Sequence, residues 1–308
     1  MLNNIDVIDA QINQQEANEF RTLLAQQNAG KTKHWDFEVI AGQFKQSNKS
    51  TDDTTFNYLQ ENFGIETSWK EIVEELTRLN KSGGSNVVYK VFFLARHGQG
   101  YHNLAHEKYG NDAWNEYWSK LTGDGEIVWG PDPELTQLGI DQATRNNQEW
   151  KVQLDQGAPK PTKFYSSPLS RSIDTLIKTW EDIVQLSNIK PLIKENIRET
   201  TGVHTCDKRS TKSKLSEKYS PLGFLFEPGF EEEDIYYKDD VRESVSHHAL
   251  RVNESFQQIF DENEHENQVI GITSHSGTIR ASLLALGHRE FAVGTGGMIP
   301  VFVKGERK

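Results

Sequence analysis

The chain has 308 residues, a length that fits one large domain or two small ones. Its net charge of -11 disfavours general nucleic-acid binding, which requires a basic surface, and no apolar run approaches the roughly 20 residues that a membrane-spanning helix needs. We expect no secretory signal at the N-terminus. The single cysteine, Cys206, excludes an internal disulfide framework, so a reducing compartment is expected, either the cytoplasm or the nucleus.

Residues 1–85 predict a polar N-terminal extension that is largely helical and irregular. Two segments within it, 56–65 and 68–80, carry apolar residues at roughly helical spacing, and a Gly-containing loop closes the extension. We expect the extension to pack on the rest of the protein through its larger apolar side chains, namely Trp35, Phe56, Tyr58, Phe63, Trp69 and Leu76.

From residue 86 onward, strands and helices are predicted to alternate. Apolar and β-branched runs indicate buried strands at 87–95, 163–168, 191–199, 268–276 and 297–305. Amphipathic spacing indicates helices at about 134–154, 169–186, 240–260 and 277–287. The alternation predicts an α/β fold for residues 86–308, a three-layer sandwich with a mostly parallel central sheet flanked by helices.

Polar residues follow three of these strands, and sheets of this kind bind ligands at the carboxyl ends of their strands. Arg96, His97 and Gly98 end the first strand. Imidazole is a nucleophile near neutral pH, a guanidinium suits bidentate binding of a phosphoryl group, and glycine lets the backbone approach a ligand. The alternative for His97 is a structural histidine that caps the strand.

A second histidine, His275, stands at a similar strand end, before a helix whose N-terminus favours an anion. A buried structural histidine is again the alternative, but two histidines at equivalent strand ends favour a shared site. Between them, Pro168 suits the first turn of a helix and places Arg171 near its start, facing the same edge. A solvated surface arginine is the alternative for Arg171.

Two further features follow the third strand. Glu199 ends it, where a partly desolvated carboxyl could protonate a leaving oxygen; an exposed, salt-bridged glutamate is the alternative.

Lys208 and Arg209 belong to a basic stretch of this acidic protein. They are expected either to bind a second anionic group of the substrate or to pair, in a solvated loop, with the acidic run 231–234. Residues 204–245 are expected to form a cap over the pocket.

Standard metal-binding patterns are absent from the sequence. His204 and Cys206, with His247 and His248 elsewhere, lack zinc spacing, and His265 falls in a polar segment expected to be solvated. The phosphate-binding and dinucleotide-binding glycine motifs are absent as well. We therefore expect neither a metal nor another cofactor.

Four motifs, LARHGQGYHN, SSPLSR, IRE and TSHSGTIR, occur in this order along the chain. Together they resemble the histidine phosphatase superfamily, which includes the cofactor-dependent phosphoglycerate mutases, and the resemblance spans roughly 88–304. The longer segments RHGQGYHN and RETTGVHTCDKR are similar to the fungal phosphomutase-like branch, whose members act mainly as phosphatases.

The resemblance implies a role for each matching residue. His97 corresponds to the phosphoryl acceptor, and Arg96, Arg171 and His275 to the other members of the phosphate pocket. Asn103 matches a position that often helps to bind the phosphate.

The proton donor follows from the same comparison. Glu199 matches the acid of the mutase-like branch. The acid-phosphatase branch instead has an aspartate directly after the second histidine, where this chain has Ser276, and this departure favours Glu199 as the donor.

The expected activity is therefore hydrolysis of phosphomonoesters or phosphoanhydrides of small anionic metabolites through a phosphohistidine intermediate. Two alternatives stay open: a phosphomutase of the phosphoglycerate mutase type, and a pseudo-enzyme that only binds phosphorylated partners. The expected partner is a phosphorylated small molecule, with no nucleic acid and no membrane.

Overall fold

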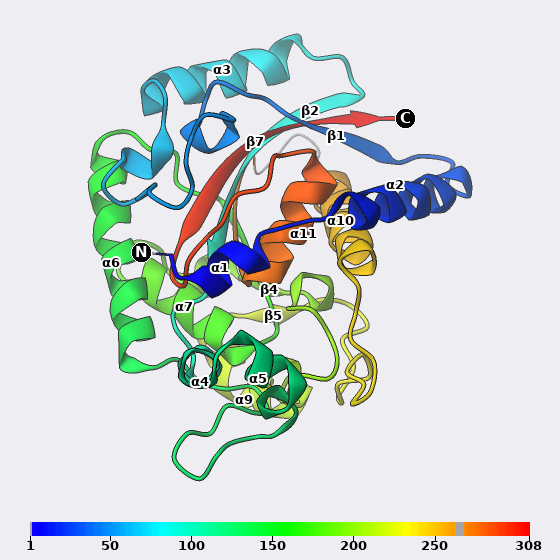
Figure 1. Cartoon of the computed structure of the whole chain (residues 1–308). Helices are drawn as coiled ribbons and strands as arrows, with labels where there is room; N and C mark the ends of the chain where they lie inside the picture. Colours follow the sequence, from blue (N-terminus) through cyan, green and yellow to red (C-terminus); the bar gives the residue numbers. More distant parts are fainter. Residues whose placement is uncertain (1, 263–267) are drawn as a thin grey trace.

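The computed structural model describes residues 2–262 and 268–308, so His265 lies outside the described residues. A single sheet runs through the centre of the molecule (Figure 1). Its strands are β1 (Trp35–Val39), β2 (Val87–Arg96), β3 (Lys163–Ser166), β4 (Leu192–Ile193), β5 (Leu225–Phe226), β6 (Val269–Ser274) and β7 (Met298–Arg307). The order across the sheet is β1-β7-β2-β6-β3-β4-β5. From β2 to β5 the neighbours are parallel, and β7 is antiparallel to β2 and to β1. The prediction of a mostly parallel sheet is confirmed.

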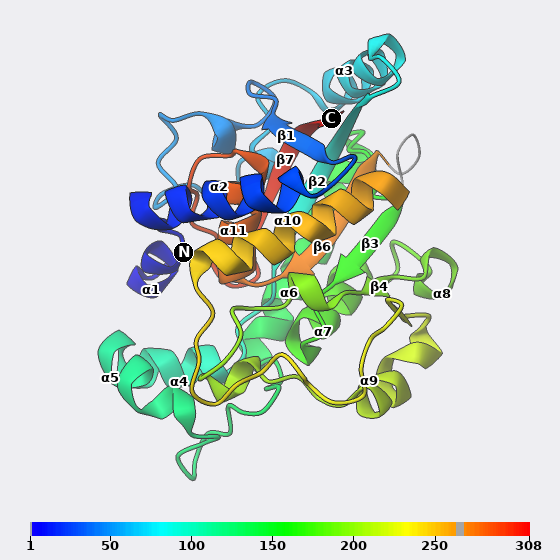
Figure 2. The same ribbon diagram turned by 90° about the vertical axis from the view of Figure 1, so that its right-hand side faces the viewer.

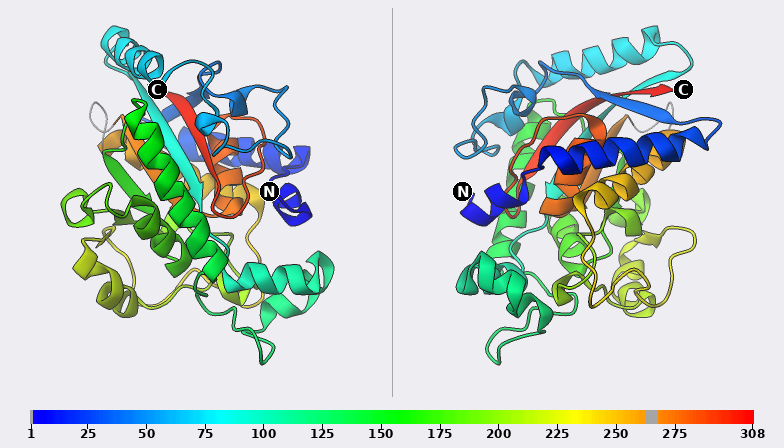
Figure 3. Two further views of the ribbon diagram at one scale, coloured as in Figure 1. Left: turned by 90° about the vertical axis from the view of Figure 1, so that its left-hand side faces the viewer. Right: turned by 45° about the vertical axis from the view of Figure 1, so that its right-hand side comes forward.

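Helices cover both faces of the sheet. The α-helices are α1 (Asn4–Asp9), α2 (Gln14–Ala29), α3 (Trp69–Ser82), α4 (Tyr101–Tyr109), α5 (Asn111–Glu116), α6 (Gln137–Asp155), α7 (Ser170–Trp180), α8 (Leu186–Ile189), α9 (Lys212–Tyr219), α10 (Val245–Glu262) and α11 (Ser276–Leu286). Helices α2, α10 and α11 lie over one face (Figure 2), and α3, α6 and α7 over the other (Figure 3). Among the described residues, no helix combines the length and the apolar character needed to cross a membrane.

Strand β2 shows why this sheet is buried on both faces. Successive side chains of a strand point to opposite faces. The ring of Phe92 packs against Phe256 of α10, with ring centroids 5.2 Å apart, whereas Phe93 packs against Trp150 of α6 at 4.8 Å. All four rings are buried. A strand covered in this way is apolar over most of its length, which is the pattern that predicted it.

The N-terminal extension packs on the body, but not entirely as predicted. Trp35 and Trp69 are buried, and α3 confirms the helix expected at 68–80. Strand β1, which was not predicted, pairs with β7 and forms one edge of the sheet. The helix expected at 56–65 is wrong: the segment forms turns, and Phe63 adopts a left-handed backbone with φ of 57° and a fully buried ring.

Other boundaries differ where polar side chains interrupt an apolar run. The strand expected at 191–199 is only β4, and a 3-10 turn follows at Glu195–Ile197. Helix α7 ends at Trp180, short of the expected 186. Helix α10 begins at Val245 and not at about 240, so Val241, which falls inside the expected helix, is 59% exposed in the preceding loop.

Candidate active site

The register of the sheet brings the predicted residues to one edge. Arg96 pairs with Ser274, and Ser166 pairs with Thr273, so the carboxyl ends of β2, β6 and β3 lie level. His97 and His275 follow directly, and their ring centroids are 4.9 Å apart. A cavity of about 490 Å³ opens at this edge. Helices α4 and α5 lie beyond this edge of the sheet (Figure 2).

The ring of His97 has a defined tautomer. Its Nδ1 atom lies 2.6 Å from the carbonyl oxygen of Gly98. Because a carbonyl oxygen only accepts hydrogen bonds, Nδ1 carries the proton of the neutral ring and Nε2 keeps its lone pair. The Nε–H of Arg171 points toward that lone pair at 3.4 Å. The geometry therefore makes Nε2 the ring nitrogen that carries the lone pair.

Burial and two cations keep this ring neutral. His97 is only 2% exposed. Desolvation, followed by the charges of Arg171 and Arg96, lowers the pKa of His97 well below its usual value of 6.5. A neutral imidazole is the form that can attack phosphorus.

His275 and Arg171 contact His97 from the protein interior, and both are fully buried. Nε2 of His275 lies 2.7 Å from the hydroxyl of Ser167, and its Nδ1 has no hydrogen-bond partner among the described residues. Arg171 donates to the carbonyl of Cys206 at 2.8 Å and to Asp207 at 3.1 Å. Both residues expected near His97 are thus beside it.

Arg96 lies on the cavity wall with its guanidinium only partly engaged. Its Nη1 donates to Asp6 of α1 at 2.6 Å and to the carbonyl of Val293 at 2.8 Å. Its buried Nε has no partner among residues 2–262 and 268–308. The contact with Asp6 links the N-terminal extension directly to the site.

Glu199 also lines the cavity, where backbone groups fix its carboxylate. Oε1 accepts the N–H of Thr200 at 2.7 Å, and Oε2 accepts the N–H of Gly277, in the first turn of α11, at 3.3 Å. A Cβ atom on Gly277 would lie 2.2 Å from Oε1, so only glycine leaves room for this carboxylate. Burial, and then the charge of Asp207, raises the pKa of Glu199.

Asp207 has the opposite character. Burial alone would raise its pKa, but Arg242 and Arg171 hold the pKa of Asp207 below its usual value. Arg242 donates to its Oδ2 at 2.8 Å, and Arg171 donates to Oδ1. The two carboxyls at this site are therefore pushed apart in pKa, with Glu199 the one that keeps a proton more readily.

Asn103 and His102 lie in the first turn of α4, at the cavity. The Asn103 side chain accepts the N–H of Gly100 at 2.9 Å, which leaves its amide N–H₂ without a partner in the described part of the chain. The ring of His102 lies 5.3 Å from that of His97, and its buried Nδ1 is unpartnered there as well. His102 was not singled out from the sequence. Its position directly before Asn103 could have identified it. The segment was not predicted to be helical, so the two side chains were not expected to lie at the same site.

Comparison with known proteins decides the family. The profile of the histidine phosphatase superfamily (branch 1) matches residues 92–293, which include both histidines, Arg171 and Glu199. The chain belongs to the histidine phosphatase superfamily.

Relatives in this superfamily include fungal proteins. A protein of Arthroderma benhamiae described as a probable phosphoglycerate mutase is 37% identical over 92% of this chain and 88% of its own length. Phosphomutase-like protein 3 of Candida albicans is 39% identical over 79% of this chain and 72% of its own. Among solved structures, a mycobacterial glucosyl-3-phosphoglycerate phosphatase aligns with 68% of this chain over 89% of its own length. The sequence identity is 17% and the TM-score is 0.41.

Lys208 and Arg209 do not line the cavity of this superfamily member. Arg209 is buried, and its Nε donates to Glu195 at 2.5 Å. Its other N–H groups donate to backbone carbonyls, those of Ser210, Glu231, Glu232 and Glu233. Lys208 places its ammonium 5.2 Å from the centre of the Tyr237 ring. Arg209 therefore contacts the acidic run 231–234, as the second alternative expected, but it does so mainly through backbone carbonyls and in the protein interior, not in a solvated loop.

The expected cap, 204–245, reaches the cavity only near its two ends, at 204–207 and 242–243. Between these ends, β5 pairs with β4 and extends the sheet. Most of the remaining cover comes from α1 and from α4 and α5, which line the cavity from two other sides. The cavity beside His97 therefore has a wall that includes the N-terminal extension.

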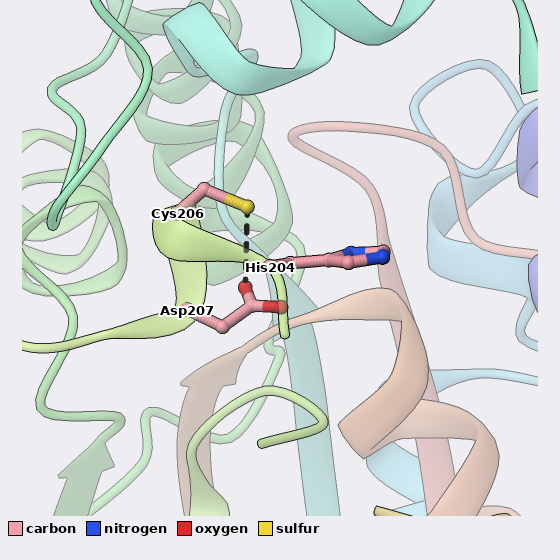
Figure 4. A group of neighbouring side chains, drawn as sticks. All are labelled: His204, Cys206 and Asp207. Atoms are coloured by element: carbon pink, nitrogen blue, oxygen red, sulfur yellow. Dashed lines mark hydrogen bonds between the residues drawn. The ribbon is translucent and has the colours of Figure 1, made fainter. Parts of the chain in front are cut away.

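His204, Cys206 and Asp207 approach one another with their donor atoms within 4.8 Å (Figure 4). Their electrostatics do not suit a cation. Asp207 is already paired with Arg171 and Arg242. Burial, and then Asp207, raises the pKa of the Cys206 thiol well above its usual value, so no thiolate is available. The cluster instead fixes Arg171 beside His97.

Proposed function

We propose that this chain is a phosphatase in which Nε2 of His97 attacks the phosphorus of the substrate. The observation that carries the proposal is the tautomer of His97, set by the 2.6 Å contact between Nδ1 and the carbonyl of Gly98. Attack forms the Nε2–P bond as the P–O bond to the leaving group breaks, giving a phosphohistidine. The Gly98 carbonyl stabilises the positive charge that the ring then acquires.

Charge on the transferred phosphoryl group would be stabilised by fixed donors around His97. Arg171 supplies its Nε–H, Arg96 its unpartnered Nε–H, His275 its unpartnered Nδ1, and Asn103 its free amide group. Donors already held by the protein need little reorganisation as the charge develops, so they favour the transition state over the ground state.

Glu199 is proposed as the acid and then the base. Its raised pKa favours the protonated form that donates to the leaving oxygen. Water then attacks the phosphorus while Glu199 accepts its proton; the new O–P bond forms as the Nε2–P bond breaks, and phosphate leaves. Asp207 is less suited to this role because Arg242 and Arg171 favour its ionised form.

The substrate class follows from the size and polarity of the site. A cavity of about 490 Å³ has the volume of a small-molecule site, and it is lined by charged and amide side chains together with His102, His106 and Trp114. This supports a phosphomonoester or phosphoanhydride of a small metabolite as substrate.

A phosphomutase is the second candidate, because the Arthroderma benhamiae relative is described as a probable phosphoglycerate mutase. The test is to incubate the protein with an aryl phosphate, with a panel of phosphorylated metabolites and with 3-phosphoglycerate, and to measure both free phosphate and isomerised product. Phosphate release is expected. Isomerisation without release would favour the mutase, and binding without either product would favour a protein that only binds phosphorylated ligands.

A further inference from the structure

The N-terminal helix α1 places a carboxylate against Arg96. Nη1 of Arg96 lies 2.6 Å from Oδ1 of Asp6, and the two side chains are only 3% and 5% exposed. The two residues are 90 positions apart, and Asp6 lies outside the segment matched by the superfamily profile, 92–293. This buried ion pair therefore adds a group from the extension to the phosphate pocket.

The contact engages only one edge of the guanidinium. Nη1 is shared by Asp6 and the carbonyl of Val293. Nε is buried without a partner among the described residues, and Nη2 has none there either. A bidentate contact to a phosphoryl group uses two parallel N–H groups, and the Nε–Nη2 edge offers such a pair. Asp6 thus holds Arg96 by the edge that a phosphoryl group does not need.

Asp6 is itself held in place by two kinds of contact. Its Oδ2 accepts the N–H of Asn3 at 3.0 Å, and its own N–H donates to the Asn3 side chain, a capping box that starts α1. Helix α1 is tied to α4 by Asn3 and Glu107, and to α11 by Asp9 and Ser276. A carboxylate held by the capping box, on a helix anchored to two others, can impose one orientation on Arg96.

We propose that Asp6 is a positioning residue, which orients the free edge of Arg96 toward the phosphoryl group in the transition state. The proposal rests on the proposed phosphatase function. Loss of Asp6 leaves a buried guanidinium held only by one carbonyl, so its free edge can turn away from the reacting group. A shift of about 1 Å in a catalytic group reduces the rate about a hundredfold.

The test compares Asp6→Asn and Asp6→Glu with Glu16→Gln in the full-length chain. Glu16 occupies the same capping-box position in α2, is only partly buried, and does not line the cavity, so it reports the effect of a weakened cap alone. The measurements are kcat and KM with an aryl phosphate, the inhibition constant of vanadate, and the Kd of inorganic phosphate by calorimetry. Thermal unfolding identifies any variant that does not fold.

We expect Asp6→Asn to lower kcat/KM roughly ten- to a hundredfold, mainly through kcat. We also expect it to weaken the binding of vanadate more than the binding of phosphate. Asp6→Glu should recover part of the loss, and Glu16→Gln should behave as the wild type. If Asp6→Asn binds phosphate more tightly and keeps or gains activity, Asp6 is a competing anion and the proposal is wrong. Equal loss in Asp6→Asn and Glu16→Gln would reduce its role to helix capping. A wild-type protein without turnover would refute the phosphatase function, while the two binding measurements would still test Asp6.

Discussion

Nε of Arg171 lies 3.4 Å from Nε2 of His97, so a guanidinium faces the nitrogen proposed to attack phosphorus. A cation at this distance disfavours a second positive charge on the ring. Together with burial and Arg96, it lowers the pKa of His97 well below 6.5. Burial and this contact together therefore favour the unprotonated form of the proposed nucleophile.

This relationship predicts an acid limb of the pH–rate profile at unusually low pH. The neutral form of His97 is lost only as pH falls through its lowered pKa, so kcat/KM should hold below pH 6.5 before it declines. On the alkaline side, the rate should fall as pH rises through the pKa of Glu199 and this residue loses its proton. That pKa lies above its usual value of 4.5. The measurement is kcat/KM from pH 3 to 9, corrected for ionisation of the substrate. An acid limb centred at or above pH 6.5 would contradict the assignment.

Glu199→Gln should discriminate between leaving groups. An alkyl phosphate needs a proton on its leaving oxygen, whereas an activated aryl phosphate does not, so the variant should lose about 10²–10⁴-fold on the former and much less on the latter. Steady-state rates on the two substrates give the comparison.

Gly277→Ala should reproduce this pattern without changing the acid itself, because its Cβ would meet Oε1 of Glu199 at 2.2 Å. Gly30→Ala, whose nearest atom is 3.9 Å away, is the matched control. Equal losses on both substrates would move the acid role to another residue, with Asp207 the next to replace.

Replacing Arg209 and replacing Lys208 should affect the stability of the protein to different extents, and neither change should alter substrate specificity. Arg209→Ala removes one of the two arginine partners of buried Glu195, the other being Arg198, and also leaves several backbone carbonyls without their donor; we expect the free energy of unfolding to fall by about 3–5 kcal/mol. Lys208→Ala loses a contact to Tyr237 and should change it by about 1 kcal/mol or less. Denaturant unfolding measures both. A folded Arg209→Ala protein that loses activity only on polyphosphorylated substrates would restore the specificity role.

Chelation should leave the rate nearly unchanged. The described residues bring His204, Cys206 and Asp207 together, but two arginines neutralise Asp207 and the thiol stays protonated. Turnover of an aryl phosphate before and after extensive dialysis against a chelator tests this. A chemical step that requires added Mg²⁺ would contradict a mechanism based on cationic side chains.

The sequence was sufficient for the parts of the site that follow strands. β2 and β6 are nearly continuous apolar runs, so their ends could be located, and parallel pairing then places His97 and His275 at one edge. Gly98 has a different role from the one expected. Gly98 was expected to approach a ligand, yet a Cβ there would meet the carbonyl oxygen of Gly139 at 2.3 Å, so it allows a close contact with the start of α6.

Other parts depend on contacts that no local pattern reveals. Asp6 lies in a six-residue helix and reaches Arg96 across 90 positions. The basic stretch at 208–218 gave no sign that Arg209 points inward, because charge in a sequence does not report the direction of a side chain. Strand β1 was missed because an edge strand buried on one side alternates polar and apolar residues only over five positions.

The most direct measurement of the proposed mechanism is the site of phosphorylation during turnover. The wild-type protein is mixed briefly with ³²P-labelled substrate, quenched in alkali and mapped by mass spectrometry. We expect acid-labile phosphate on Nε2 of His97, and we expect His97→Ala to lose both the label and all but about a thousandth of the turnover. His102, whose ring centre is 5.3 Å away, is the nearest alternative acceptor on the cavity wall. Label on His102, or turnover without label in a protein that lacks His97, would contradict the assignment of His97 as the nucleophile.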